Sequence, residues 1–166
     1  MASGPASPSE HATAWSPAEE GERYERGRPD YPAAIAPLLQ RELRLTPGTR
    51  LADVAAGTGK LTRRLVETPA TVLAVEPMPG MRAHLRHAAP SAAPVAARVE
   101  HLPLATGTVD AVTVAQAFHW FRLPAASREL RRVLRPGGRL AVVINSRDTS
   151  VPLVRRLWEI LGRYEQ

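Results

Sequence analysis

The chain contains no cysteine and few aromatic residues, and both shortages exclude classes of function. Without cysteine there is no disulfide bond, no thiolate nucleophile and no cysteine-ligated zinc site. Phe, Trp and Tyr together make up 5% of the residues, so few side chains are available to stack on exposed nucleic-acid bases. These absences direct attention to chemistry that depends on carboxylates, glycine turns and histidine.

Long apolar runs are also missing. No run approaches the ~18 residues that a membrane-spanning helix needs, and the first fifteen residues lack the apolar block of a secretory signal. We therefore expect a cytoplasmic protein that has no membrane partner.

Lysine is almost absent, because every cation except Lys60 is an arginine, yet the net charge is +6. A basic surface can indicate nucleic-acid binding. Here the arginines are spread in ones and twos between leucines at helical spacing, which is typical of solvated helix faces. We do not expect a nucleic-acid partner.

The organisation of the chain indicates one folded domain behind a tail. Residues 1–17 are rich in Ser, Pro and Ala without periodicity and predict a disordered tail, which leaves 18–166 as the domain. Residues 22–32 are polar and close with two prolines, which exclude a long helix there. Apolar residues at helical spacing from Ile35 to Leu43 then predict a helix.

Beyond this helix, strand-like and helix-like segments alternate. The predicted strands cover residues 50–55, 71–76, 94–98, 109–115 and 139–145. The predicted helices follow Gly59, run from Met78 to Ala88, run from Ala126 to the "RPGG" stop at 135–138, and cover residues 151–164. We predict that Trp158 and the leucines of the last helix pack in the core. The alternation predicts an α/β fold with a doubly wound parallel sheet, and apolar strands such as "LAVVI" fit a sheet covered on both faces.

The stretch "LADVAAGTGKLT", residues 51–62, is a glycine turn between the first strand and the next helix, where such sheets bind ligands. A phosphate-binding P-loop is excluded, because Val54 stands where its first glycine belongs and Leu61 follows the lysine. A dinucleotide fingerprint fails at its third glycine, which is Thr62 or Lys60 depending on the register. The carboxylate of Asp53 would also repel a pyrophosphate.

A cationic ligand without phosphates suits this turn better. Asp53 would meet a positive group, while Gly57 and Gly59 would let the backbone approach closely. The alternative is a capping Asp on a tight turn with no ligand. That alternative leaves unexplained a second acid, Glu76, which ends the second strand where a carboxylate can accept two hydrogen bonds from a ribose diol.

At this point the sequence resembles the class I S-adenosylmethionine-dependent methyltransferases, in particular the small-molecule group with a "QAFHWF"-like segment. The resemblance covers about residues 22 to 160 and is carried by the segments "YERGRPDYP", "LADVAAGTGKLTRRL", "VLAVEPMPGMRAHL", "ARVEHLPL", "VDAVTVAQAFHWF" and "ELRRVLRPGGRLAVVIN". It implies a mostly parallel Rossmann-like sheet in the order 3-2-1-4-5. It also implies S-adenosylmethionine as cofactor and methyl transfer to a small-molecule acceptor.

The resemblance also implies which residues bind the cofactor. These are Tyr24 and Arg28 in an N-terminal lid, Asp53, Ala55 and Gly57 in the turn, Glu76 for the ribose, Met78, Val99 and Glu100 around the adenine, and Gln116 at the methionine end. Two positions depart from the family pattern. Ala55 replaces a glycine, and Arg98 stands where an acid or a similar residue is usual.

Histidine supplies the one candidate for a catalytic base. His119 follows the fourth strand, so it either serves as the base for an acceptor that must lose a proton or packs the loop together with Trp120. His84 and His87 lie three apart on one helix without a third ligand, so we expect a solvated face and no metal site.

The end of the chain raises the last expectation. The family's sheet normally continues into an antiparallel hairpin after the last helix, and the chain reaches Gln166 without one. The strand at 139–145 would then be an uncovered edge, which predicts marginal stability, self-association or a truncated gene product. Two alternative functions stay open, a cofactor-binding but catalytically incompetent truncated methyltransferase and a nicotinamide oxidoreductase, the second disfavoured by Asp53 and Thr62.

Overall fold

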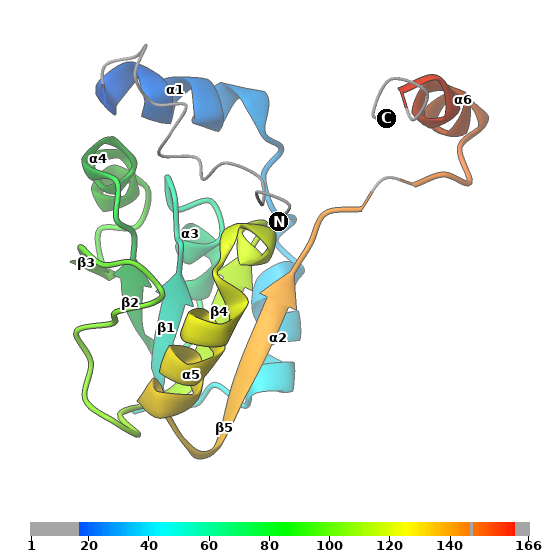
Figure 1. Ribbon diagram of the computed structural model, residues 1–166. Coiled ribbons are helices and arrows are strands. Elements are labelled where there is room, and N and C mark those ends of the chain that lie inside the picture. The colour runs from blue at the N-terminus through cyan, green and yellow to red at the C-terminus, as the bar shows by residue number, and fades with distance from the viewer. Residues whose placement is uncertain (1–16, 147, 162–166) are drawn as a thin grey trace.

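Five strands form one parallel sheet in the order β3-β2-β1-β4-β5, as the resemblance implies (Figure 1). The computed structural model describes residues 17–146 and 148–161. Its strands are β1 (Arg50–Val54), β2 (Thr71–Val75), β3 (Ala93–Val95), β4 (Val109–Ala115) and β5 (Leu134–Val143). The winding direction reverses between β1 and β4, and ligands of such sheets bind at the carboxyl ends of the strands beside that reversal.

Helices cover both faces of this sheet. They are α1 (Pro17–Gly27), α2 (Ile35–Leu43), α3 (Thr62–Leu65), α4 (Pro79–Ala88), the 3-10 helix η3 (Phe118–Trp120), α5 (Leu123–Val133) and α6 (Pro152–Leu161). One apolar cluster joins α2, α3 and α4 to one face, and a second joins α5 to the other. The domain is thus an α/β/α sandwich, with α1 across the carboxyl ends of the strands.

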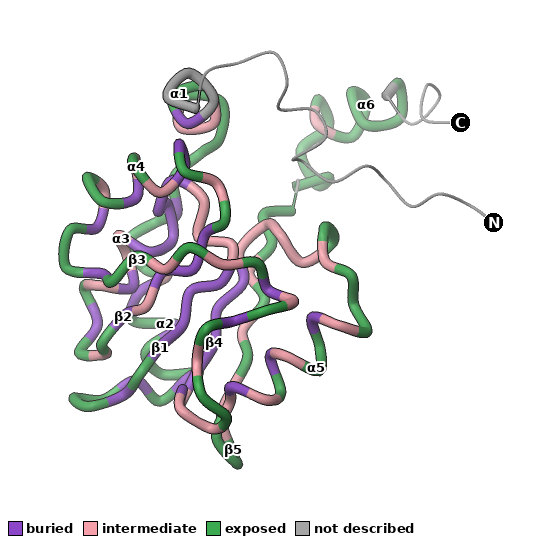
Figure 2. Tube along the Cα trace, turned by 60° about the vertical axis from the view of Figure 1, so that its left-hand side comes forward, coloured by how far each residue is buried: buried purple, intermediate pink, exposed green. Residues whose placement is uncertain are grey.

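The central strands β1 and β4 are buried on both faces (Figure 2). Leu51 and Ala111 belong to the cluster under α2 and α3, whereas Ala52 and Val112 belong to the cluster under α5. Each fully buried leucine or valine contributes about 1.5–3 kcal/mol to folding. The two clusters therefore hold the carboxyl ends of β1 and β4 in fixed positions.

The predicted ranges of β1, β2 and β4 agree with the structure to within one residue, but that of β5 was wrong. Instead of covering 139–145, β5 begins at Leu134, directly after α5. Leu134 pairs with Val109 and Arg139 pairs with Ala111, so the four residues between them bulge from the ladder. Gly137 adopts a φ of 77° in this bulge, a left-handed conformation that glycine tolerates well. The "RPGG" segment does end the preceding helix, as predicted.

Helix α1 was not predicted. It ends at Gly27, two residues before Pro29, so the prolines limit the helix without preventing it. Gly21 faces α4 so closely that an added Cβ would lie 2.1 Å from the His84 ring. His84 therefore packs against α1, which corrects the expected solvated face, while His87 is exposed. Residues 1–16 of the predicted tail lie outside the described residues.

Helix α6 does not pack in the core, so that prediction was wrong. It stands apart from the sheet, and the Leu157 side chain is 52% exposed (Figure 1). The predicted edge position of β5 is confirmed, and Val142 on this strand is 40% exposed. Self-association through the edge stays a prediction. Among the described residues, no helix has both the length and the apolar character needed to cross a membrane.

Candidate functional site

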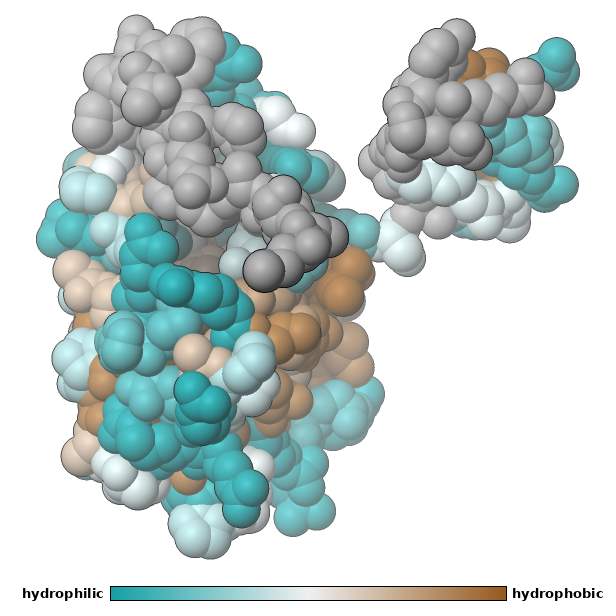
Figure 3. Space-filling model, in the orientation of Figure 1, coloured by the Kyte–Doolittle hydropathy of each residue, from teal (hydrophilic) through white to brown (hydrophobic). Residues whose placement is uncertain are grey.

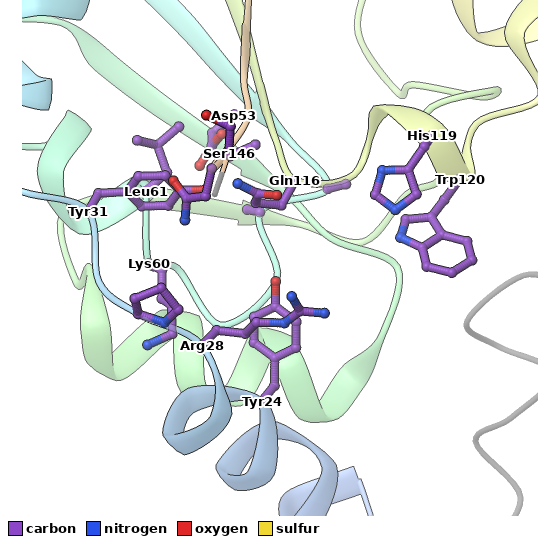
Figure 4. Close-up of a pocket in the computed structure, with 15 residues that line it drawn as sticks. Tyr24, Arg28, Tyr31, Asp53, Lys60, Leu61, Gln116, His119, Trp120 and Ser146 are labelled. Atoms are coloured by element: carbon purple, nitrogen blue, oxygen red, sulfur yellow. The ribbon is translucent and has the colours of Figure 1, made fainter. Parts of the chain in front are cut away.

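A cavity of about 790 Å³ lies between the carboxyl ends of the central strands and the segment that carries Tyr24 and Arg28 (Figure 4). It is lined by Tyr24, Arg28, Pro29, Tyr31, Asp53, Ala55, Ala56, Lys60, Leu61, Ala115, Gln116, His119, Trp120, Asn145 and Ser146. Its volume is within the range of about 300–1,000 Å³ that is typical of small-molecule sites. The cavity thus occupies the place that the sheet topology predicts for a ligand.

Asp53, the penultimate residue of β1, lies at the floor of this cavity and is 1% exposed. Its carboxylate accepts hydrogen bonds from the hydroxyls of Thr62, at 2.7 Å, and Thr113, at 2.8 Å. Burial, with a smaller contribution from the nearby charge of Glu76, raises the pKa of Asp53 to about 6, although the two hydrogen bonds lower it. The fold therefore tolerates a carboxyl group that would be easier to bury in its neutral form, which is typical of a functional site.

The turn after Asp53 is built from left-handed residues. Ala55 has a φ of 58°, Gly57 of 59° and Gly59 of 88°. An added Cβ at Gly59 would lie 3.3 Å from the Leu85 Cα of α4, so this glycine allows close packing of the turn on α4. The approach of a ligand to the backbone at Gly59 stays a prediction. Gly57 is required by its backbone conformation.

Ala55 is the one member of this turn whose side chain opposes its conformation. A left-handed backbone costs an L-residue about 1–2 kcal/mol in the folded state. Glycine removes this cost, but its greater conformational freedom stabilises the unfolded chain by about 0.5–1 kcal/mol. We expect Ala55→Gly to raise the free energy of unfolding by about 0.5–1 kcal/mol in a urea titration. Ala56→Gly is the matched control, because Ala56 has no positive φ and should lose stability instead.

Glu76, at the end of β2, holds the turn from the side. Its Oε2 accepts the Gly57 N–H and its Oε1 accepts the Met78 N–H, both at 2.9 Å. The Glu76 side chain is buried. Among the described residues, Glu76 is not one of those that line the cavity. Glu76 thus fixes the backbone of the glycine turn against the start of α4.

Gln116 points into the cavity from the end of β4 and is held in an unusual conformation. Its φ is 57°, and its buried Nε2 has no hydrogen-bond partner among the described residues. Strained, unsatisfied polar groups of this kind cluster at ligand sites. Burial also raises the pKa of the neighbouring Tyr31 hydroxyl to about 12, so this phenol stays neutral.

An ion cluster joins the lid, residues 24–32, to the glycine turn. The Lys60 ammonium lies 3.0 Å from Asp30 and 3.3 Å from Glu25, and the Arg63 guanidinium contacts the same two acids. Burial alone would raise the pKa of Glu25, but the hydrogen bonds from Thr58 and Arg63 outweigh it and lower that pKa. The two cations therefore hold the lid over the cavity.

Lys60 is the buried centre of this cluster, at 8% exposure. We expect Lys60→Met to lower the free energy of unfolding by about 1–2 kcal/mol, since Glu25 and Asp30 each lose one of their two cationic partners. Arg41→Met is the control, because Arg41 and Glu42 form an exposed pair whose loss should cost less than about 0.5 kcal/mol. Equal losses in the two variants, measured by urea unfolding, would contradict a stabilising role for the cluster.

The structure brings six of the eleven predicted site residues into the cavity. They are Tyr24, Arg28, Asp53, Ala55, Gln116 and His119. The Tyr24 hydroxyl points from the lid toward the Gln116 amide, while His119 lies at the other side of the cavity beside Trp120 (Figure 4). The rings of His119 and Trp120 are 4.7 Å apart, so His119 both packs against the tryptophan and faces the cavity.

The remaining predicted residues lie outside the lining of this cavity, within the described part of the chain. Gly57 and Glu76 form the turn beside it. Met78 precedes α4 and is half-buried, and Val99 belongs to the apolar cluster under α5. The Glu100 carboxylate accepts the Arg122 N–H at 3.3 Å.

Several residues of the site were not predicted from the sequence. Thr62 and Thr113 hold Asp53, Tyr31 walls the cavity, and Lys60 and Arg63 anchor the lid. The signal for Lys60 was its isolation as the one lysine of the chain, placed inside the glycine turn. Thr113 carried no such signal, because a threonine inside a buried strand is indistinguishable from ordinary packing.

Comparison with known families and proteins gives one consistent result. The sequence profile described as a methyltransferase domain matches residues 52–142, which is more than half of the chain. An uncharacterized methyltransferase of Mycobacterium tuberculosis is 50% identical over 141 residues, which cover 84% of this chain and 56% of that protein. The chain thus spans little more than half the length of this curated relative.

Solved structures agree with the sequence relatives. A structure described as a type II methyltransferase from Anaeromyxobacter dehalogenans is 33% identical, with a TM-score of 0.66 over 82% of this chain and 59% of that one. A structure from Methanococcus maripaludis, described as an S-adenosyl-L-methionine-dependent methyltransferase, has a TM-score of 0.64 at 18% identity. It covers 80% of this chain and 67% of that one. The second likeness concerns the fold alone.

Proposed function

Because the chain belongs to the class I S-adenosylmethionine-dependent methyltransferases, we propose that it transfers a methyl group from S-adenosylmethionine to a small-molecule acceptor. The observation that carries this proposal is the buried Asp53 carboxylate at the floor of the cavity, together with the Gln116 Nε2, which has no hydrogen-bond partner among the described residues. The Asp53 carboxylate would pair with a cation, and the Gln116 Nε2 would donate to a hydrogen-bond acceptor. The amino-acid end of the cofactor offers both.

The residues present fit this cofactor. Asp53 would face the ammonium group, the Nε2 of Gln116 would donate to the carboxylate, and Arg28 in the lid would add a positive charge for the same carboxylate. Glu76, which already accepts the Gly57 and Met78 N–H groups, would also accept the ribose diol. Met78, Val99 and Glu100 would surround the adenine. When bound, S-adenosylmethionine supplies an electrophilic methyl group on a sulfonium ion.

The protein's own contribution would be positioning and exclusion of water. Orientation of two reactants in one site is worth on the order of 7–11 kcal/mol. The lid, fastened by Lys60 and Arg63, would close one side of the cavity, and η3 would border the acceptor side. For an acceptor that must lose a proton, His119 would take it, since its ring lies at the cavity and is accessible to solvent.

Calorimetric titration tests the cofactor assignment. We expect S-adenosylhomocysteine to bind with micromolar affinity, and NAD to show no heat of binding because Asp53 repels its pyrophosphate. Binding of NAD but not of S-adenosylhomocysteine would overturn the proposal in favour of an oxidoreductase. Transfer of labelled methyl groups to a panel of phenols, amines and carboxylic acids then tests the activity.

A second candidate is a protein that binds the cofactor without transferring its methyl group. Tight binding of S-adenosylhomocysteine together with no turnover across the acceptor panel would support this candidate.

A further inference from the structure

The helix α1 presents one inward face to the rest of the molecule. Gly21, Tyr24 and Glu25 follow one another at i, i+3 and i+4, which places them on one side of the helix. Gly21 is buried, and Tyr24 and Glu25 are half-buried. The part of α1 that is visible in Figure 3 is hydrophilic. Among residues 21–27, therefore, no buried apolar side chain holds α1 in place.

Helix α1 lies against α4, and a histidine of α4 fills the place where the two helices meet at Gly21 (Figure 1). A Cβ added at Gly21 would lie 2.1 Å from the Cδ2 atom and 2.6 Å from the Nε2 atom of the His84 ring. The ring therefore occupies the space that any other side chain at position 21 would need. Glycine is less favourable than alanine inside a helix, so its place in the middle of α1 is explained by the ring that it admits.

The same face of α1 contacts the cavity within four residues of this place. Tyr24 lines the cavity, and its Cε1 atom would lie 4.0 Å from a Cβ added at Gly57 in the glycine turn. Glu25 pairs with the Lys60 ammonium at 3.3 Å. A helix rises 1.5 Å per residue, so Tyr24 and Glu25 lie only about 4.5–6 Å along the axis from Gly21. A displacement of α1 at Gly21 is therefore transmitted directly to the cavity and to the ion cluster.

We propose that His84 is a positioning residue, whose ring over Gly21 seats α1 on α4 and thereby keeps the lid in place over the cavity. The contact between His84 and Gly21 is called the seat below. The inference rests on the proposed function only for the identity of the ligand under the lid, S-adenosylmethionine. When the seat is lost, α1 shifts on α4 and the ion cluster alone has to hold the lid. The lid then spends more time open, and the ligand leaves more easily.

Lys60 reports the position of the lid without any ligand, because it is the one lysine of the chain. It is 8% exposed, and its ammonium lies against Glu25 and Asp30, both of which belong to the lid. An amine-acetylating reagent should therefore reach Lys60 only when the lid opens. The rate of acetylation, followed by mass spectrometry of the peptide that contains residue 60, then measures the open fraction of the lid.

Gly21→Ala drives the His84 ring from its place, and we expect it to raise the open fraction of the lid. A rise from about 5% to about 50% open would speed the acetylation of Lys60 about tenfold, but would weaken the affinity for S-adenosylhomocysteine only about twofold, because affinity follows the closed fraction. A loss of affinity larger than the gain in rate would mean that the cavity itself is distorted, and would overturn the proposal. Gly27→Ala is the matched control, because a Cβ added there meets nothing within 4 Å and should leave the acetylation rate unchanged.

His84→Ala completes a double-mutant cycle with Gly21→Ala. We expect His84→Ala alone to speed the acetylation of Lys60, and we expect Gly21→Ala to add no further increase once the ring is absent. An unchanged rate in His84→Ala, additive effects of the two substitutions, or equal rates in Gly21→Ala and Gly27→Ala would each overturn the seat. If S-adenosylhomocysteine does not bind the unmodified protein, the proposed function fails, while the acetylation rates still decide the role of His84.

Discussion

Replacing Asp53 with Asn is expected to make the protein more stable at pH 7.5 and at the same time to weaken its affinity for S-adenosylmethionine. The expected gain in the free energy of unfolding is about 1–2 kcal/mol. The expected loss of affinity is about 10- to 150-fold, since a bond to a charged group contributes about 1.5–3 kcal/mol. Urea unfolding and calorimetric titration measure the two effects separately.

The gain in stability follows from the burial of Asp53. The difference between an ordinary pKa of 3.8 and the value of about 6 in the folded protein corresponds to about 3 kcal/mol when the carboxyl group is ionised. Asparagine removes this cost and keeps one carbonyl acceptor for Thr62 or Thr113. It loses the stronger, charge-assisted character of the two hydroxyl bonds, which reduces the net gain.

The effect depends on pH with a definite sign. Between about pH 4 and pH 6 the folded protein holds a proton on Asp53 that the unfolded chain has already released, so the contribution of this group to stability falls as the pH rises. The advantage of Asp53→Asn should therefore shrink as the pH is lowered from 7.5 and should vanish by about pH 4. Over the same range, affinity for the cationic cofactor should rise with pH in the unmodified protein and stay flat in the variant.

Asp110→Asn is the matched control, because Asp110 is an acid at the opposite end of the neighbouring strand. It pairs with Arg135 at 2.5 Å and accepts the Arg50 N–H at 2.6 Å. Its replacement should lower stability and leave cofactor affinity unchanged. If Asp53→Asn instead lowered stability as Asp110→Asn does, Asp53 would be a structural acid and the electrostatic argument for the site would fail.

The elements that could be predicted from the sequence are those whose local pattern matches their final environment. Residues 109–115 are apolar on both faces, and β4 is buried on both faces. Asp53 and Glu76 end neighbouring strands, and a parallel sheet brings such ends to one edge. The topology alone was therefore enough to place the two acids together.

Helix α1 and the position of α6 could not be predicted in this way. The polar helix α1 gains its support from distant partners, because Glu25 meets Lys60 and Arg63 across more than thirty residues. The apolar pattern of α6 predicts that one side of the helix is buried, but it does not identify the surface that covers this side. Both cases depend on tertiary contacts that no local pattern contains.

Replacing Glu76 is expected to have the second large effect on stability, opposite in sign to the effect of replacing Asp53. We expect Glu76→Ala to lower the free energy of unfolding by about 3–5 kcal/mol, because the N–H groups of Gly57 and Met78 both lose a charged acceptor. Cofactor affinity should fall by about 100-fold or more, since the ribose diol loses its acceptor and the turn loses its shape. Urea unfolding and titration with S-adenosylhomocysteine measure these two losses.

Hydrogen exchange separates the two roles of Glu76. In Glu76→Ala the amides of Gly57 and Met78 should exchange faster, whereas in Asp53→Asn they should keep their protection, because Asp53 bonds only hydroxyl groups among the described side chains. Glu76→Gln keeps one carbonyl oxygen and should lose about half as much stability, which provides a readout if the alanine variant fails to fold. Glu76→Gln would instead leave both amides protected and gain stability only if Glu76, like Asp53, were a destabilising buried acid. That result would mean that Glu76 does not hold the turn.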